Sequence, residues 1–191
     1  PRASVEANFA LRSVVGAEHF NSGVATHEHE LVKLASSILR GPLGSSTIRG
    51  IEDADCVLVL GEDLTQTAAR LALAVRQAAR GKMITEGAKK NIPEWQVIAL
   101  ADLVQQAKNP VFIATPEVSR LDDVATQTYR ASPEQIAKLG FAGAHRLDAG
   151  APVAAGLDEA TAKLADEIAE ALSKSARPLI VSGCGAGSVS V

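Results

Sequence analysis

The sequence predicts an α/β domain, in which helices pack on both faces of a mostly parallel sheet. Three short runs are almost entirely apolar, and glycine or proline follows each at once: Cys56–Leu60, Val111–Thr115 and Pro178–Ser182. Longer segments with apolar residues at helical spacing separate these runs. Continuous apolar strands that alternate with helices are typical of parallel sheets buried on both sides. We therefore expect a three-layer, Rossmann-like architecture.

The composition limits the functions open to the chain. Of its 191 residues, 47% are hydrophobic but only 3% are aromatic, so the core must consist of Ala, Val, Leu and Ile. A chain of this length buries roughly 70% of its unfolded surface and needs no disulfide or metal for stability. The net charge of −3, without a basic stripe, argues against nucleic-acid binding. No apolar run is long enough to cross a membrane, and two distant cysteines without a signal peptide indicate a reducing, cytoplasmic compartment.

Two helices are expected before the first strand. Ser4 can cap a helix that runs to Arg12, and an acidic first turn supports it. The segment Thr26–Leu39 begins with polar residues and ends before Gly41, as helices commonly do. Residues 44–47 are rich in glycine and serine and are expected to form a loop.

A long helix is expected after the first strand. Asp63 or Thr65 would cap it, the alanine-rich sequence continues it through Ala79, and Gly81 would end it. The segment Ile92–Ala107 stays undecided between strand and helix, because short apolar runs fit both.

The remainder of the chain continues the alternation. Pro116 ends the second strand, and Leu121–Ala125 is expected to be a short helix. Ser132, followed by proline and glutamate, predicts the start of a helix that runs to about Leu147. The amphipathic segment Asp158–Ser175 predicts another, which leads into the last strand.

We treat residues 1–191 as one region of a larger architecture, and the 148–157 linker is a candidate boundary within it. The chain begins without Met and ends just after a glycine-rich turn that should lead into a helix. On this basis the sequence is expected to be a piece of a longer protein.

Three strand exits should lie together at one edge of the sheet, where α/β sheets bind ligands: Gly61–Thr67, Thr115–Asp123 and Gly183–Ser188. The glycines of the last exit are too closely spaced for a dinucleotide fingerprint. At the first exit, Glu62 and Asp63 would repel a phosphate placed at the following helix. The edge therefore predicts a crevice whose residues disfavour phosphate.

Other reactive residues do not form a recognisable site. His27 and His29 are two residues apart on a helix start and point to different sides, and His19 is distant. Cys56 and Cys184 lack the spacing of a zinc or iron–sulfur site. The adjacent carboxylates of residues 122 and 123 diverge, and we interpret them as favouring a helix dipole.

The order of these segments resembles that of the molybdopterin oxidoreductases, a family with a formate dehydrogenase/DMSO reductase-like fold. The similar segments are Pro1–Leu11, Ile51–Gly61, Ala69–Gly81, Ser119–Ala125 and Ala176–Gly185. Within that family, three stretches resemble the large iron–sulfur subunit (the G subunit) of bacterial NADH-quinone oxidoreductase, respiratory complex I: Val57–Thr67, Ala72–Ala78 and Arg120–Ala131. The resemblance spans nearly the whole chain.

This resemblance implies a part of an enzyme complex that passes electrons from NADH to quinone and translocates protons. It implies 4Fe–4S and 2Fe–2S clusters bound upstream of this region. It also implies docking to other peripheral-arm subunits, at the cytoplasmic face of the bacterial inner membrane and without insertion into it. In this family, active formate dehydrogenases carry a thiolate or selenolate metal ligand in the stretch that corresponds to Asn21–Leu31, and here there is none. Gly61-Glu62-Asp63-Leu64 stands where those enzymes have a pterin-contacting Gly-x-Asn-Pro loop.

We therefore expect a scaffold with no catalytic, cofactor-binding or metal-binding residue in this region, and no molybdenum cofactor. One alternative is a piece of an active molybdopterin oxidoreductase such as a formate dehydrogenase. A second is a nucleotide-binding Rossmann-like module that uses the sheet edge.

Overall fold

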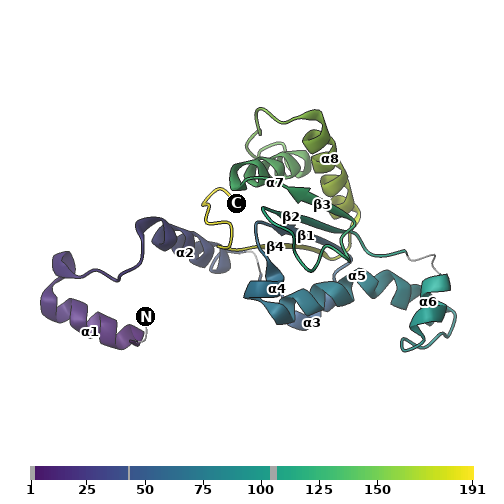
Figure 1. The fold of residues 1–191 in the computed structure, drawn as a ribbon, viewed down its shortest axis with the longest axis horizontal. Helices are drawn as coiled ribbons and strands as arrows, with labels where there is room; N and C mark the ends of the chain where they lie inside the picture. The colour runs from purple at the N-terminus through teal and green to yellow at the C-terminus, as the bar shows by residue number, and fades with distance from the viewer. Residues whose placement is uncertain (1–2, 43, 104–106) are drawn as a thin grey trace.

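A four-stranded parallel sheet forms the centre of the computed structural model, which describes residues 3–42, 44–103 and 107–191 (Figure 1). The strands are β1 (Cys56–Leu60), β2 (Val111–Thr115), β3 (Gln127–Arg130) and β4 (Pro178–Ser182). Their order across the sheet is β3-β2-β1-β4, and every neighbouring pair is parallel. The predicted α/β fold class is thus confirmed.

Some helices cover the two faces of this sheet, and others precede its first strand. They are α1 (Val5–Val15), the 3-10 helix η1 (Ala17–His19), α2 (Thr26–Leu39), α3 (Ile48–Glu52), α4 (Leu64–Thr67), α5 (Ala69–Lys89), α6 (Val97–Leu103), α7 (Pro133–Leu147) and α8 (Glu159–Lys174). None of these helices, within the residues that the structure describes, is both long and apolar enough to span a bilayer. The segment left undecided between strand and helix contains α6, and its residues 104–106 lie outside the described residues, as do residues 1 and 2.

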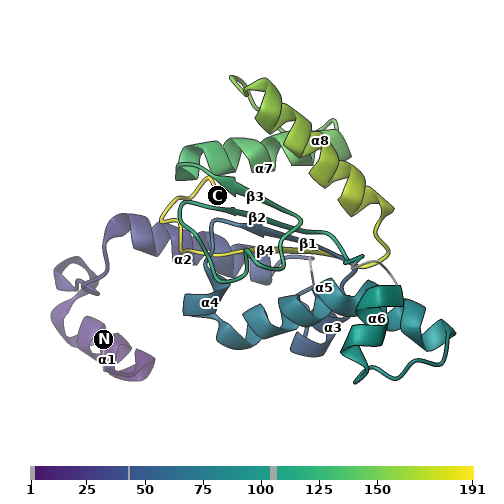
Figure 2. The same ribbon diagram turned by 45° about the vertical axis from the view of Figure 1, so that its right-hand side comes forward.

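Side chains alternate between the two faces of the sheet, as the period of a β-strand requires. On one face, Val57 and Val59 of β1 join a core with α3 and α5. On the other face, Cys56 and Leu58 join a core with α7 and α8. Figure 2 shows the two helical layers above and below the strands. Both layers contribute small side chains. Most buried apolar residues are Ala, Val, Leu or Ile, as predicted, and Cys56, Met83 and Phe112 are the exceptions among the described residues.

β1 lies between β2 and β4, so it holds the sheet together from its centre. Its Val57 is in register with Val111 of β2 and Leu179 of β4. At the amino end of β1, the Asp55 carboxylate accepts hydrogen bonds from the backbone amides of Ala176 and Arg177, both at 2.9 Å, and from the Ser175 hydroxyl. These bonds fix the turn that delivers the chain from α8 to β4.

The long helix differs from its prediction at both ends. Asp63 caps a separate short helix, α4, and Ala68 interrupts the helix before α5 begins. α5 then passes through Gly81 instead of ending there. A Cβ on Gly81 would lie 2.8 Å from Nδ2 of Asn109, which donates a 2.8 Å hydrogen bond to the carbonyl of Ala78. The glycine makes room for this amide and does not act as a stop signal.

One further prediction about local structure fails, and two elements were not predicted. The segment Leu121–Ala125, expected to be helical, forms turns at residues 121–124, and the strand β3 begins at Gln127. β3 was missed because it is a short edge strand whose residues Gln127–Arg130 are exposed or half-buried, so no apolar run marks it. α3 was also missed, although Thr47 caps it by accepting a hydrogen bond from the Gly50 amide at 3.1 Å.

The two amino-terminal helices lie to one side of the sheet (Figures 1 and 2). The predicted cap of α1 is confirmed, because the Ser4 side chain accepts a hydrogen bond from the Ala7 amide at 3.2 Å. α1 contains no buried residue, and Leu31 is the buried residue of α2. At the opposite end of the chain, residues 148–157 join α7 to α8, which pack against each other on one face of the sheet.

Candidate functional site

The three predicted strand exits do meet at the carboxyl edge of the sheet. The Gly61 amide donates a 2.7 Å hydrogen bond to the carbonyl of Ala114 in β2. On the other side, the Ser182 hydroxyl of β4 donates to the carbonyl of Leu60 at 3.2 Å. The exit of β1 is therefore flanked by those of β2 and β4, as the parallel topology requires.

Glu62 occupies the space between the first and last exits. Its side chain is buried, with 7% of the residue exposed, and its carboxylate accepts a 2.8 Å hydrogen bond from the Gly185 amide. A Cβ on Gly183 would overlap this carboxylate, and one on Gly185 would lie 2.7 Å from Oε2. The glycine-rich turn and Glu62 thus fit together as a closed unit. The crevice expected here is filled by the protein's own side chain.

The Asp63 carboxylate forms hydrogen bonds both to the start of α4 and to the loop after β2. Its carboxylate caps α4 by accepting hydrogen bonds from the Thr65 amide at 3.0 Å and the Thr65 hydroxyl at 2.7 Å. The buried Ser119 hydroxyl, on the loop after β2, donates to the same oxygen at 2.9 Å. Partial burial alone would raise the pKa of Asp63, but these hydrogen bonds outweigh it and hold the pKa below its ordinary value.

We expect acid to remove this stabilisation. Because the pKa of Asp63 is lower in the folded than in the unfolded state, its contribution is complete above pH ~4 and is lost as the pH falls through the folded-state pKa. Asp63→Asn should lower the free energy of unfolding by about 1 kcal/mol at pH 7, the difference between a charged and a neutral acceptor. Urea titrations between pH 7 and 3 should show the two curves converging in acid.

The control for this titration is Glu117→Gln, because Glu117 is exposed on the neighbouring loop. Its free energy of unfolding should follow that of the unsubstituted protein at every pH. A gap between Asp63→Asn and the unsubstituted protein that stays constant down to pH 3 would contradict the assignment.

Asp122 and Asp123 diverge as predicted, but the helix-dipole interpretation is wrong because they lie in a turn. Asp122 forms an ion pair with Arg130 at 2.5 Å, and Arg130 Nη1 donates to the Thr115 hydroxyl at 2.9 Å. Asp123 pairs with Arg76 of α5 at 2.7 Å. The hydrogen bond from Arg76 lowers the pKa of Asp123 below its ordinary value. These pairs tie the loop after β2 to its neighbours.

His19, His27, His29 and Cys56 lie away from this edge, whereas Cys184 lies on the exit of β4 itself. His27 and His29 are exposed in the first turn of α2, and His19 lies in η1. Cys56 is fully buried at the amino end of β1, where burial raises its thiol pKa to about 11. Cys184 is exposed beyond the carboxyl end of β4, so the two thiols lie at opposite ends of the sheet. Across the described residues, no three His, Cys, Asp or Glu side chains cluster as a metal site would require.

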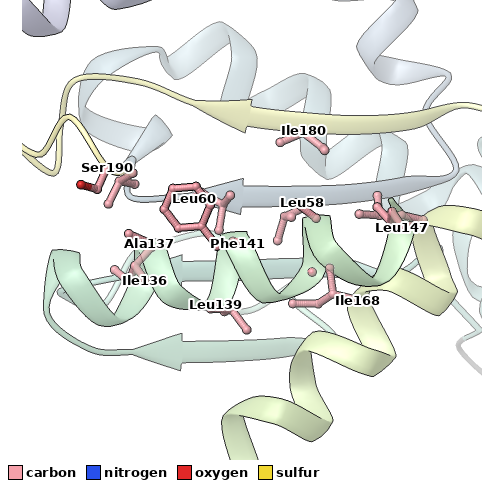
Figure 3. A pocket seen from close by; sticks show the side chains of 15 residues that line it. Leu58, Leu60, Ile136, Ala137, Leu139, Phe141, Leu147, Ile168, Ile180 and Ser190 are labelled. Carbon is pink, nitrogen blue, oxygen red and sulfur yellow. The ribbon is translucent and has the colours of Figure 1, made fainter. Parts of the chain in front are cut away.

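Sequence reasoning missed an apolar groove between α7 and strands β1 and β4 (Figure 3). Its volume is about 290 Å³. Leu58 and Leu60 of β1 and Ile180 of β4 form its floor, and Phe141 and Leu147 of α7 form its wall. Single exposed apolar residues on separate elements leave no pattern in a sequence, so only the fold brings them together.

Proteins of known name resemble this chain along its full length. It is 49% identical over 192 aligned residues to the G subunit of NADH-quinone oxidoreductase from Salmonella typhimurium, and 48% identical to the protein of that name in Escherichia coli K12. The protein of that name in Pseudomonas fluorescens is 49% identical over 189 residues. The match covers 98–100% of this chain but 21% of each relative, so the chain spans about a fifth of their length. No protein-family model matches the chain.

Proposed function

Because this chain is homologous over its whole length to a segment of the NADH-quinone oxidoreductase G subunit, we propose that it is a structural part of the electron-transfer subunit of such a complex. Electrons would pass from NADH to quinone through iron–sulfur clusters that lie outside these residues. This region would hold the cluster-bearing part in place and dock against neighbouring subunits of the peripheral arm, at the cytoplasmic face of the membrane. Residues 1–191 would act as one architectural unit in this role.

The observation that carries the proposal is the filled crevice at the carboxyl edge of the sheet. In this architecture the edge is where a ligand binds. Here Glu62 packs against Gly183 and Gly185 and accepts a hydrogen bond from the latter. A phosphate or pterin bound here would have to displace the Glu62 carboxylate, which packs tightly against the backbone of Gly183 and Gly185. The filled crevice therefore supports a structural role for this domain rather than a ligand-binding one.

The residues that could bind a cofactor support the same role. Asp63, Asp122 and Asp123 each have a partner within the protein that stabilises the local fold. The 21–31 stretch, where a catalytic molybdenum enzyme would carry its thiolate, contains no cysteine. No observation favours an active molybdenum enzyme or a nucleotide-binding module over the structural role.

The proposal is tested by Glu62→Ala in the complete NADH-quinone oxidoreductase. The substitution removes the acceptor of the Gly185 amide and should destabilise the subunit by about 1 kcal/mol. We expect less assembled complex, measured on native gels, but an unchanged rate of NADH-driven quinone reduction per assembled complex.

A reduced rate in normal amounts of assembled complex would overturn the structural role, because it would place Glu62 in the electron-transfer chemistry. The exposed Glu117, replaced by alanine, is the matched acidic control and should change neither quantity. Purified 191-residue chain should contain iron and molybdenum at background level only. A stoichiometric metal with a visible chromophore would also overturn the proposal.

A further inference from the structure

Large apolar side chains are exposed at the groove beside α7. Ile180 of β4 is 57% exposed, although the same face of β1 is buried at Leu58. Across the groove, Phe141 is 40% exposed and Leu147 is 47% exposed. Figure 3 shows these side chains around the opening between α7 and β4. The helical layer therefore stops short of the last strand.

The groove is suited to a helix rather than to a small molecule. The wall on α7 includes Gly140, Gly143 and Ala144, three small residues on one helix face, and nothing lies within 4 Å of a Cβ built on Gly143. Small residues let a second helix approach closely, with its ridge in this groove. Ser190 is the one polar side chain among the residues that line it, whereas ligand pockets carry several placed polar groups.

The topology indicates how a helix would reach this position. α5 connects β1 to β2 on one face, and α7 and α8 connect β3 back across the sheet to β4 on the other face. Parallel crossovers are right-handed in almost all proteins. A further connection that moves outward from β4 would therefore place its helix on the α7 and α8 face, over Ile180. β4 pairs only with β1 among the described strands, so its outer edge can accept another strand.

From these observations we propose that the groove holds an amphipathic helix of the same polypeptide, from the part of the subunit that lies outside the matched region. The relatives contain such additional polypeptide, because the match covers 21% of the length of each. The helix would insert apolar side chains between Ile180 and Phe141 and continue the layer formed by α7 and α8. This inference rests on the proposed structural role and identifies the surface that joins this region to the remainder of the subunit.

Photo-crosslinking in the full-length subunit tests the inference. The photoreactive amino acid p-benzoylphenylalanine replaces Ile180 in one variant and Phe141 in a second, where it retains the original ring. The control position is Ile98, which is 80% exposed on α6, beside α5 and away from the groove. After irradiation, protease digestion and mass spectrometry should map both groove positions to one peptide of the same chain, outside residues 1–191, with apolar residues at helical spacing. Ile98 should not crosslink to that peptide.

Four results would overturn the inference: a crosslink to a second copy, a crosslink to a different subunit, a small-molecule adduct, or no crosslink from either groove position. Mixing isotope-labelled and unlabelled subunits distinguishes contacts within a chain from contacts between copies. A crosslink to a different subunit would leave the structural role intact and remove only the intramolecular helix. A loss of electron transfer per assembled complex in Glu62→Ala would instead remove the structural role, whatever the crosslinks show.

Discussion

Asp55→Ala should lower the free energy of unfolding of the 191-residue chain by about 3 kcal/mol, because hydrogen bonds to a charged group contribute about 1.5–3 kcal/mol each and this group is only half-buried. The carboxylate accepts from the Ser175 hydroxyl and from the amides of Ala176 and Arg177. Without this carboxylate, the turn that places β4 beside β1 loses the hydrogen bonds that fix it. In a protein of this size the melting temperature should fall by roughly 6–12 °C, measured by circular dichroism.

The acidic neighbour Asp53 provides the matched control. Its side chain is 60% exposed, and its ion pair with Arg177 is long, at 4.0 Å. Surface pairs of this kind contribute little, so Asp53→Ala should change the free energy of unfolding by less than about 0.5 kcal/mol. If the two alanine variants were equally stable, the carboxylate of Asp55 would not be what holds the β4 turn.

Gly61→Ala should destabilise the chain by about 2 kcal/mol, for two reasons that act together. Gly61 has a φ of +69°, a left-handed conformation that costs a residue with a Cβ about 1 kcal/mol or more. In addition, the new Cβ would overlap the side chain of Val191 and lie 3.0 Å from the Cβ of Ala186. Urea unfolding followed by circular dichroism measures the change.

Gly187→Ala separates these two contributions. Gly187 has a similar φ of +63°, but a Cβ there meets nothing within 4 Å. Its substitution should therefore show only the conformational part, about 1 kcal/mol. Combining Gly61→Ala with Val191→Ala should recover part of the difference. Equal effects of the two glycine substitutions would mean that the contact with Val191 does not contribute.

The strands predicted from the sequence share one property, which is burial on both faces. Val57 and Leu58 point to opposite cores and are both apolar, so β1 appears as a continuous run. β3 lies at the edge, and its Gln127 and Thr128 face solvent, so the same rule could not find it. Gly81 misled the helix prediction because its role is to accommodate Asn109, a residue that is distant in the sequence.

At the candidate site, too, the sequence predicted the features that depend on neighbouring residues and on parallel topology, and missed the contact that depends on residues far apart in the chain. Parallel topology alone predicted that the exits of β1, β2 and β4 would meet, and they do. The sequence also indicated that Glu62 disfavours a phosphate. It could not show that the side chain fills the crevice, because Gly185, its hydrogen-bond partner, lies 123 residues further along the chain. The resemblance to the G subunit of NADH-quinone oxidoreductase came from ordered stretches of sequence, and the relatives of that name confirm it.

The central position of β1 has a consequence for folding during synthesis. β1 pairs with β4 across a large separation, since Leu60 and its partner Ser182 are 122 residues apart. A ribosome that adds about 5–20 residues per second would take roughly 6–24 s to supply that strand. Until then the β4-facing edge of β1 has no strand beside it. The nascent chain would therefore depend on chaperones during this interval, and slowing translation before residue 178 should lengthen its association with them.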